Sequence, residues 1–217
     1  MRWRLSLSKA KDSSDHNEVK AVFPDCSGFF SERRMHMKIV PYEEKYRKDV
    51  QRICVDTGSP DNQVNAEHRR FTLLMYCDEY LDHETGFVLL DDHDVPQGYV
   101  LCAENYGSFQ KHMKPYLEKI RKECPSFANR TDISEYEQYQ NEYPAHLHID
   151  IEEDYTGHGR GTALIQTLLD HLKRKSVKGI MLGVDKHNER AFSFYQKTGF
   201  HILKEDEDSA LLGLMLR

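Results

Sequence analysis

Apolar residues recur every three or four positions in two stretches of the first half of the chain, residues 42–54 and 66–81. Such spacing places apolar side chains on one face of a helix. The pattern therefore predicts two helices, and the segment MKIVP just before them predicts a short strand. The positions that define the two periods are Tyr46, Val50, Ile53, Phe71, Leu74, Met75 and Leu81.

The central part of the chain predicts strands. The segments GFVLL and GYVLCA flank the polar run DDHDVPQ, a pattern typical of an antiparallel hairpin. The segment AHLHIDI (145–151) alternates strictly, with apolar residues on one face and His146, His148 and Asp150 on the other. We expect a half-buried central strand whose polar face contacts water.

The remaining segments predict helices and strands in turn. Polar helical stretches in 108–143 predict an insertion or lid between the hairpin and the central strand. Leucines at helical spacing predict a helix from about residue 160 to about 175. After it, GIMLGV predicts a buried strand, NERAFSFYQKTG a helix, and FHILK and ALLGLMLR two final strands. Residues 1–36 show no sustained period, and we expect them to be a poorly ordered extension of a single domain formed by residues 37–217.

Composition and charge restrict the classes of function. The formal net charge is −6 and basic residues are scattered, so no continuous track for nucleic acid is predicted. No apolar run is long enough for a membrane span. The five cysteines are widely spaced without a CxxC pair, which argues against a zinc knuckle and against a secreted disulfide framework. We therefore expect a cytoplasmic protein with a cationic or amine-bearing partner, and neither nucleic acid nor membrane as a partner.

Three glycines at alternate positions, Gly157, Gly159 and Gly161, lie between the central strand and the following helix. Glycine has no Cβ, so this segment suits a phosphate bound at the helix start, or simply a tight turn. The Walker pattern is excluded because no Gly-Lys-Ser/Thr follows, and GxGxxG is excluded because its third glycine would fall at Thr162 or Leu164. On spacing alone, both interpretations stay open.

The segments YTGHGRGTAL and LGVDKHNERAFSFYQKTGF resemble the two signature blocks of the GNAT superfamily of N-acetyltransferases. The first block reads Q/R-x-x-G-x-G/A; Gly159 and Gly161 match its glycines, and Thr156 replaces its Gln or Arg. The segment YPAHLHID (143–150) is similar to the acetyltransferase-like domain of O-GlcNAcase and its stand-alone bacterial relatives. The second block is matched by Asn188, Ala191, Phe194, Tyr195, Gly199 and Phe200.

This resemblance implies a mixed α/β (α+β) single domain: a mostly antiparallel central sheet flanked by helices, with a helical insertion before the cofactor-binding strand. It also implies acetyl-CoA as co-substrate, and we expect no metal. Backbone amides of the glycine segment would hold the pyrophosphate, and those of the central strand would pair with the pantetheine arm. The implied cofactor-binding residues are Leu147, Ile149, Ile151, Gly157, His158, Gly159, Arg160, Gly161, Thr162 and Asn188.

Acetyl transfer to an amine needs a proton donor for the leaving thiolate and a proton acceptor for the ammonium. Tyr195 resembles the general acid of the family, and a phenol with a pKa of about 10 can donate to a thiolate whose conjugate acid has a pKa of about 8.5. Asp150 and His148 are the candidate bases, although polar residues on such a strand often only contact water. We expect direct attack on acetyl-CoA by a small-molecule or peptide amine in a ternary complex, and a homodimer is compatible with this activity.

Two alternatives come from other classes of function. His146, His148 and Asp150 occupy alternate positions on one strand face, a spacing that can converge on zinc. Such a metal site leaves the glycines and the second block without a role. The other alternative is a catalytically silent module that keeps the fold and binds a partner through residues 108–143.

Overall fold

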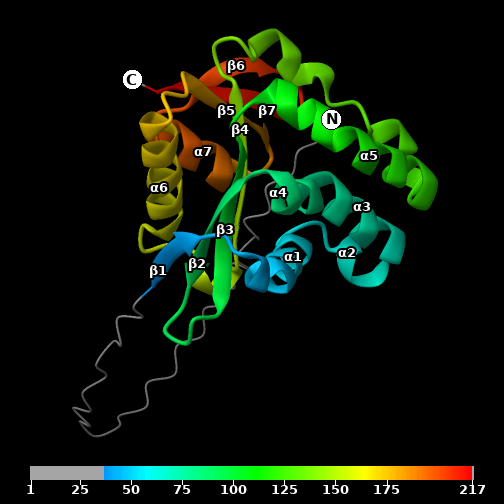
Figure 1. Cartoon of the computed structure of the whole chain (residues 1–217), viewed down its shortest axis with the longest axis horizontal. Helices are drawn as coiled ribbons and strands as arrows, with labels where there is room; N and C mark the ends of the chain where they lie inside the picture. The colour runs from blue at the N-terminus through cyan, green and yellow to red at the C-terminus, as the bar shows by residue number, and fades with distance from the viewer. Residues whose placement is uncertain (1–36, 217) are drawn as a thin grey trace, which may run out of the picture.

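The predicted strands join into one seven-stranded sheet of order β1-β2-β3-β4-β5-β7-β6 (Figure 1). The computed structural model describes residues 37–216, so the extension predicted for 1–36 lies outside the described residues. Every neighbouring pair is antiparallel except β4 with β5, which confirms the mostly antiparallel sheet. The strands are β1 Lys38–Pro41, β2 Thr85–Leu90, β3 Pro96–Ala103, β4 Ala145–Ile151, β5 Gly179–Asp185, β6 His201–Glu205 and β7 Ser209–Met215.

The helices fall where the apolar spacing predicts them, with one difference. The helix predicted over 66–81 is broken at Cys77, whose φ of −134° and ψ of −62° are not helical. The break redirects the chain, so that Tyr80 and Leu81 join the core over β2 and β3. None of the helices in residues 37–216 combines the length and apolar character of a membrane span. The helices are α1 Arg47–Asp56, α2 Asp61–Val64, α3 Ala66–Tyr76, α4 Asp78–His83, α5 Tyr106–Glu123, α6 Arg160–Arg174 and α7 Glu189–Lys197.

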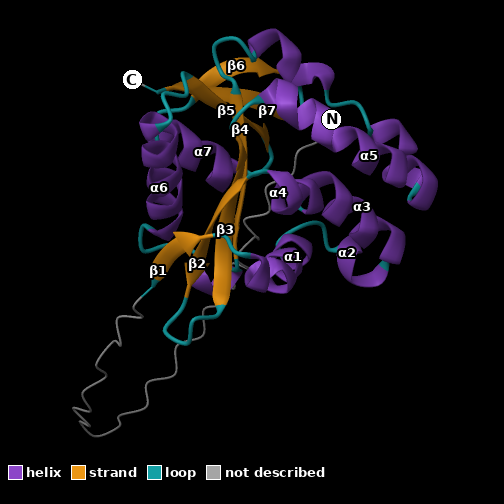
Figure 2. Ribbon diagram, viewed as in Figure 1, coloured by secondary structure: helices purple, strands orange, loops and turns teal. Residues whose placement is uncertain are grey.

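Helices lie on both sides of the sheet (Figure 2). The sheet separates two hydrophobic cores. On one face, side chains of α1, α3, α4 and α5 pack against β2 and β3. On the other face, α6 packs against β2 and β3 and α7 against β5, in a core that also includes side chains of β4 and β7. The apolar stripe of α6 is fully buried, and each leucine in it contributes about 1.5–3 kcal/mol to the free energy of unfolding.

The predicted half-buried central strand is wrong in one respect: all seven residues of β4 are buried. The helices α1 and α3–α5 cover the face that carries its polar residues, so these residues contact protein rather than water. His146 lies among the rings of Tyr80, Tyr106, Phe109 and Tyr136, and its Nε2 is hydrogen-bonded to the Tyr80 hydroxyl at 2.7 Å. Burial lowers the pKa of His146 to about 3, which keeps the ring neutral.

The predicted helical insertion lies between β3 and β4, but α5 is more than a polar lid. Six of its side chains are buried in the core shared with α3 and α4. The amphipathic period was obscured in the sequence by the polar and charged residues that fill the outer face. This segment therefore stabilises the face of the sheet that β4 presents to α1 and α3. The buried residues are Tyr106, Phe109, Met113, Tyr116, Leu117 and Ile120.

Glu79 in α4 is a buried acid with no hydrogen-bond partner in the described part of the chain. Its side chain is 1% exposed, neither carboxyl oxygen has a hydrogen-bond partner, and the nearest basic atom is Nδ1 of His112 at 3.9 Å. Burial, together with the charges of Glu84 and Asp82, raises the pKa of Glu79 to about 9. A buried carboxyl of this kind stays protonated at neutral pH.

Replacing Glu79 with Gln is expected to remove a pH-dependent loss of stability. The unfolded carboxyl titrates near 4.5 and the folded one at about 9. The contribution of Glu79 to the free energy of unfolding is therefore highest below the lower value, falls between the two by up to about 1.4 kcal/mol per pH unit, and levels off above the higher value. Urea unfolding of wild type and Glu79→Gln across this range measures the difference. Glu118→Gln, an exposed change on α5, is the matched control; parallel curves for wild type and Glu79→Gln would show that Glu79 is not a buried neutral acid.

Candidate active site

The strands β4 and β5 separate soon after they meet. They pair only at Ala145–Ile180 and His146–Met181, whereas β3 pairs with β4 from His146 to Ile151. From 147 to 151, the edge of β4 that faces β5 therefore has no strand partner within residues 37–216. Unpaired backbone N–H and C=O groups need hydrogen bonds from another source. This edge can accept an extended ligand as one further strand.

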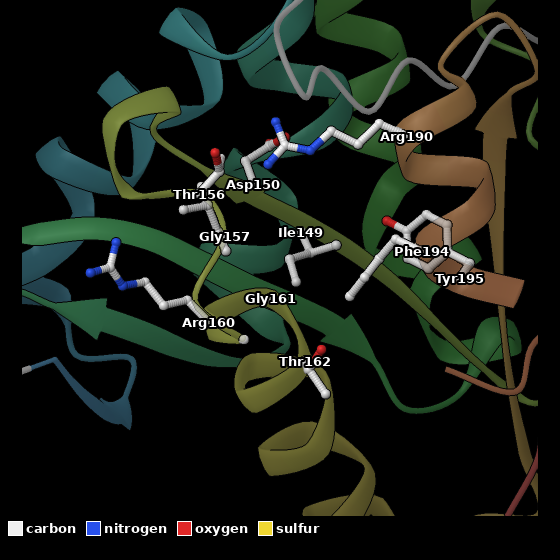
Figure 3. A pocket seen from close by; sticks show the side chains of 12 residues that line it. Ile149, Asp150, Thr156, Gly157, Arg160, Gly161, Thr162, Arg190, Phe194 and Tyr195 are labelled. Atoms are coloured by element: carbon white, nitrogen blue, oxygen red, sulfur yellow. The ribbon is translucent and has the colours of Figure 1, made fainter. Parts of the chain in front are cut away.

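A cavity of about 160 Å³ lies beside this open edge, between β4, the glycine segment and α7 (Figure 3). Its position matches the site predicted from the two sequence blocks. The lining combines exposed backbone with apolar side chains, and Arg190 extends across it from α7 (Figure 3). The lining residues are Ile149, Asp150, Ile151, Thr156, Gly157, Gly159, Arg160, Gly161, Thr162, Arg190, Phe194 and Tyr195.

The glycine segment turns its backbone amides outward at the start of α6. Gly157, His158 and Gly159 all have left-handed φ, at 83°, 51° and 75°. A Cβ on Gly157 or Gly159 would meet no atom within 4 Å, so backbone conformation rather than crowding favours glycine there. The amides of Gly161 and Thr162 precede the first helical hydrogen bond, from Ala163 N–H to the Gly159 carbonyl, and have no carbonyl partner within the described chain. Such free amides and the helix dipole attract an anion.

The predicted cofactor-binding residues divide into two groups. Ile149, Ile151, Gly157, Gly159, Arg160, Gly161 and Thr162 line the cavity, whereas Leu147, His158 and Asn188 do not. The Leu147 side chain packs in the core beneath α6. Asn188 caps α7 by accepting a hydrogen bond from the Ala191 N–H at 3.0 Å. The Arg160 guanidinium folds back, donating to the Tyr155 carbonyl at 3.0 Å.

Tyr195 reaches the cavity from α7, on the side opposite the glycine segment. Its side chain is buried, and its hydroxyl is directed away from α7 toward β4 (Figure 3). Burial and the charge of Asp150 raise the pKa of Tyr195 well above its usual value of 10. The phenol is therefore protonated at neutral pH and can act as a hydrogen-bond donor.

A second cavity, of about 590 Å³, opens on the α1–α3 side of the sheet. His148 lines this cavity, and Asp150 lines both cavities. Asp150 is thus the one residue common to the linings of both cavities within residues 37–216. Sequence analysis did not single out the α1 and α3 residues of the larger cavity, because they come from a segment about 90 residues before β4. Its walls include Cys54, Asp61, Phe71, Tyr76, Arg130 and Asp185.

Asp150 is held by two neighbours on the inner face of the sheet. The Tyr99 hydroxyl donates to its Oδ2, and His148 Nε2 lies 3.1 Å from the same oxygen. Burial alone would lower the pKa of His148, but the charge and hydrogen bond of Asp150 and the hydrogen bond of Cys54 outweigh it and raise the pKa to about 10. Hydrogen bonds from Cys77 and His148 lower the pKa of Cys54.

The contacts of His148 and Asp150 distinguish these two candidates for the general base. The His148 imidazole already carries its proton at neutral pH, so it has no free lone pair in this state. Asp150 keeps acceptor capacity and reaches both cavities. The alternative prediction of a metal site formed by His146, His148 and Asp150 is wrong, because the aromatic rings around His146 hold it away from the other two residues. Within residues 37–216, the group that gathers with His148 and Asp150 is completed by Cys54.

Comparison with known proteins agrees with this geometry. The chain is 40% identical over 166 residues to N-alpha-acetyltransferase 30 of Schizosaccharomyces pombe, an alignment covering 75% of this chain and 82% of that protein. The crystal structure of SsHAT superposes with a TM-score of 0.64 at 25% identity, over 83% of this chain and 98% of that chain. An acetyltransferase structure from Salmonella typhimurium with its cofactor acetyl-CoA superposes with a TM-score of 0.50 at 14% identity, over 84% and 95% of the two chains.

The family is shown by a direct match along most of the chain. The model of the Acetyltransferase (GNAT) family matches residues 54–200. This range includes β4 with its open edge, the glycine segment and Tyr195, as well as Cys54 at its first position. The chain therefore belongs to the GNAT family of acetyltransferases.

Proposed function

We propose that this chain transfers the acetyl group of acetyl-CoA to a primary amine by direct attack in a ternary complex. The observation that carries this proposal is that Asp150 lines both the cavity beside the open β4 edge and the larger cavity on the other side. Two substrates that enter from opposite sides would meet at this residue. Membership of the GNAT family supports acetyl-CoA as the donor.

The donor side suits acetyl-CoA in two respects. The pantetheine arm contains two amides, and the unpaired edge of β4 at 147–151 offers hydrogen-bond partners to an extended chain of this kind. At the end of that edge, the free amides of Gly161 and Thr162 face the cavity and suit the pyrophosphate. Arg190 adds a positive charge at the rim.

The reaction requires one bond to form and one to break. The amine nitrogen attacks the thioester carbonyl carbon, and the carbon–sulfur bond then breaks to release the CoA thiolate. We infer that the Tyr195 hydroxyl stabilises this thiolate, mainly as a hydrogen-bond donor, because its pKa lies well above the value of about 8.5 typical of a thiol. Asp150 binds the incoming ammonium beside the larger cavity. The ammonium loses one proton to water before it attacks, and the second N–H proton released as the amide forms passes to water or to the CoA thiolate.

The acceptor is proposed to be an amine of a peptide or protein. The larger cavity carries Asp61, Asp150 and Asp185, which favour an ammonium, and aromatic rings that can contact an apolar side chain. A relative that is 40% identical is named as an N-alpha-acetyltransferase, which supports an α-amine in particular. A small-molecule amine is the alternative that the size of the cavity also allows.

Several finer expectations remain proposals. We propose that residues 37–217 form the acetyltransferase domain and that the protein acts in the cytoplasm without a metal cofactor. We also propose the predicted role in cofactor binding for four residues, namely Gly157, His158, Arg160 and Asn188. The closer likeness to the O-GlcNAcase domain depends on residues 143–150 and stays a prediction.

Gly161→Val is expected to weaken acetyl-CoA binding by at least about tenfold, or about 1.4 kcal/mol. Gly161 lines the cavity, and its φ lies outside the left-handed region. A Cβ there would lie 3.4 Å from Cζ of Phe194, so a branched side chain would occupy the space in which we expect the ligand to bind. Isothermal titration calorimetry measures the change. Ala163→Val, an exposed site on the same helix, is the matched control. Equal affinities in wild type and Gly161→Val would place the ligand elsewhere.

Tyr195→Phe is expected to lower kcat by about a hundredfold while leaving the Kd for acetyl-CoA within about twofold, because the hydroxyl acts on the leaving thiolate. The assay follows acetyl transfer to a peptide with one free α-amine, with the modified site read by mass spectrometry. Tyr155→Phe removes a hydroxyl near the same cavity and serves as control. Absence of acetylated product with wild type, across peptides and small amines, would refute the proposed function; a Tyr195→Phe enzyme at full rate would refute only the role of Tyr195.

A further inference from the structure

Three different metal-binding side chains meet in the wall of the larger cavity. Cys54 comes from α1, and His148 and Asp150 come from the inner face of β4. One ligand atom from each side chain lies within 4.8 Å of the other two, and all three residues are buried. All three also line the cavity, so an ion could reach them from solvent without unfolding the core.

The spacing of His148 Nε2 and Asp150 Oδ2 fits two ligands of a tetrahedral ion. Zinc binds Cys sulfur at about 2.3 Å and His nitrogen or carboxylate oxygen at about 2.0–2.2 Å, which places two light ligand atoms about 3.3 Å apart. His148 Nε2 and Asp150 Oδ2 are 3.1 Å apart. An ion that replaces the shared proton would therefore move these atoms by only a few tenths of an ångström. Three protein ligands leave the fourth position open toward the cavity.

Neighbouring side chains already hold the three ligands in place. The Tyr99 hydroxyl donates to Asp150 Oδ2, and the Tyr76 ring stacks on His148 with centroids 5.7 Å apart. Cys54 is packed in the same core as Cys77. Partners of this kind orient metal ligands and raise affinity because little reorganisation accompanies binding.

A second group with ligand atoms close together lacks these features. Glu79, Glu84 and His112 also lie within 4.8 Å of one another, but His112 is exposed and the group contains no sulfur. Carboxylates with one exposed histidine give a weaker and less selective site for zinc than a buried thiolate with a histidine. This group serves instead as an internal reference, because a metal bound there gives no thiolate signal.

We propose that Cys54, His148 and Asp150 form a binding site for Zn²⁺, and that an ion in this site blocks the acceptor end of the active site. The blocking effect rests on the proposed acetyl transfer, in which Asp150 receives the ammonium. The ion takes a thiolate, a neutral imidazole and a carboxylate, and the displaced protons pass to solvent. Zinc is thus an inhibitory ligand of this chain and not its cofactor.

Co²⁺ is the probe that reports directly on the ligands, because a thiolate bound to Co²⁺ gives a charge-transfer band in the near ultraviolet. Titration of wild type is expected to give this band with one equivalent of ion, and Zn²⁺ is expected to abolish it by displacement. Cys54→Ser is expected to lose the band and to weaken Zn²⁺ binding by at least about tenfold. His148→Gln provides an independent ligand deletion if Cys54→Ser does not fold. Cys102→Ser is the matched control, since Cys102 is a fully buried thiol on the opposite face of the sheet.

Inhibition is measured separately from binding. Zn²⁺ is expected to inhibit acetyl transfer in competition with the amine and not with acetyl-CoA, and a chelator is expected to restore the rate. The site is refuted if no thiolate band forms, or if the band persists in both Cys54→Ser and His148→Gln. Binding without inhibition refutes the blocking effect. If wild type transfers no acetyl group, the proposed function fails, while the Co²⁺ spectrum still decides whether the site exists.

Discussion

The separation of β4 from β5 is the feature on which the rest of the site depends. A parallel pair that continued along both strands would satisfy the backbone of β4 and close the space between the two halves of the sheet. Pairing stops after two residue pairs, so five residues of β4 keep an open edge. That edge lies beside the free amides that precede α6, and the Tyr195 side chain faces it from α7. The sheet thus supplies a binding surface made mostly of backbone.

The polar face of β4 is costly for the fold and therefore points to function. Removing two charges from water costs several kcal/mol per ion, and buried ion pairs are often no more stabilising than apolar residues of the same size. Here His148 and Asp150 are buried together, with Tyr99 as a further donor to Asp150. An apolar pair would serve the core as well, so stability alone does not account for these residues. Their position accounts for them better, because His148 lines the larger cavity and Asp150 lines both cavities.

Much of the fold could be predicted from the chain, because its elements carry strong local signals. The alternation in 145–151, the leucine stripe of α6 and the hairpin before α5 are all where the pattern places them. The burial of β4 could not be predicted, since it depends on helices that pack against it from distant parts of the chain. The alternation of apolar residues and histidines in 145–151 is the same whether the polar face of the strand contacts water or is covered by helices. The break at Cys77 has no sequence signal of the Gly or Pro kind either.

The site was predicted in part, and the missing part has a physical reason. The glycines and Tyr195 belong to short local motifs, so the sequence placed them correctly beside one cavity. Cys54 meets His148 only because α1 packs over β4, and no spacing along the chain encodes that contact. Asn188 shows a different case: the motif allows both a helix cap and a ligand contact, and the structure shows the cap. Motifs therefore indicated residues that line the cavity beside β4 but not the α1 and α3 residues that line the larger cavity.

The central claim is that acetyl-CoA lies along the open edge of β4 with its pyrophosphate on the glycine segment. Hydrogen–deuterium exchange of the backbone amides, with and without acetyl-CoA, tests this most directly. We expect the backbone amides of 147–151 and 157–162 to exchange more slowly when acetyl-CoA is bound, with smaller changes in β1 and β6. Binding that leaves both segments unprotected, or that protects the sheet edge at β1 instead, would contradict it.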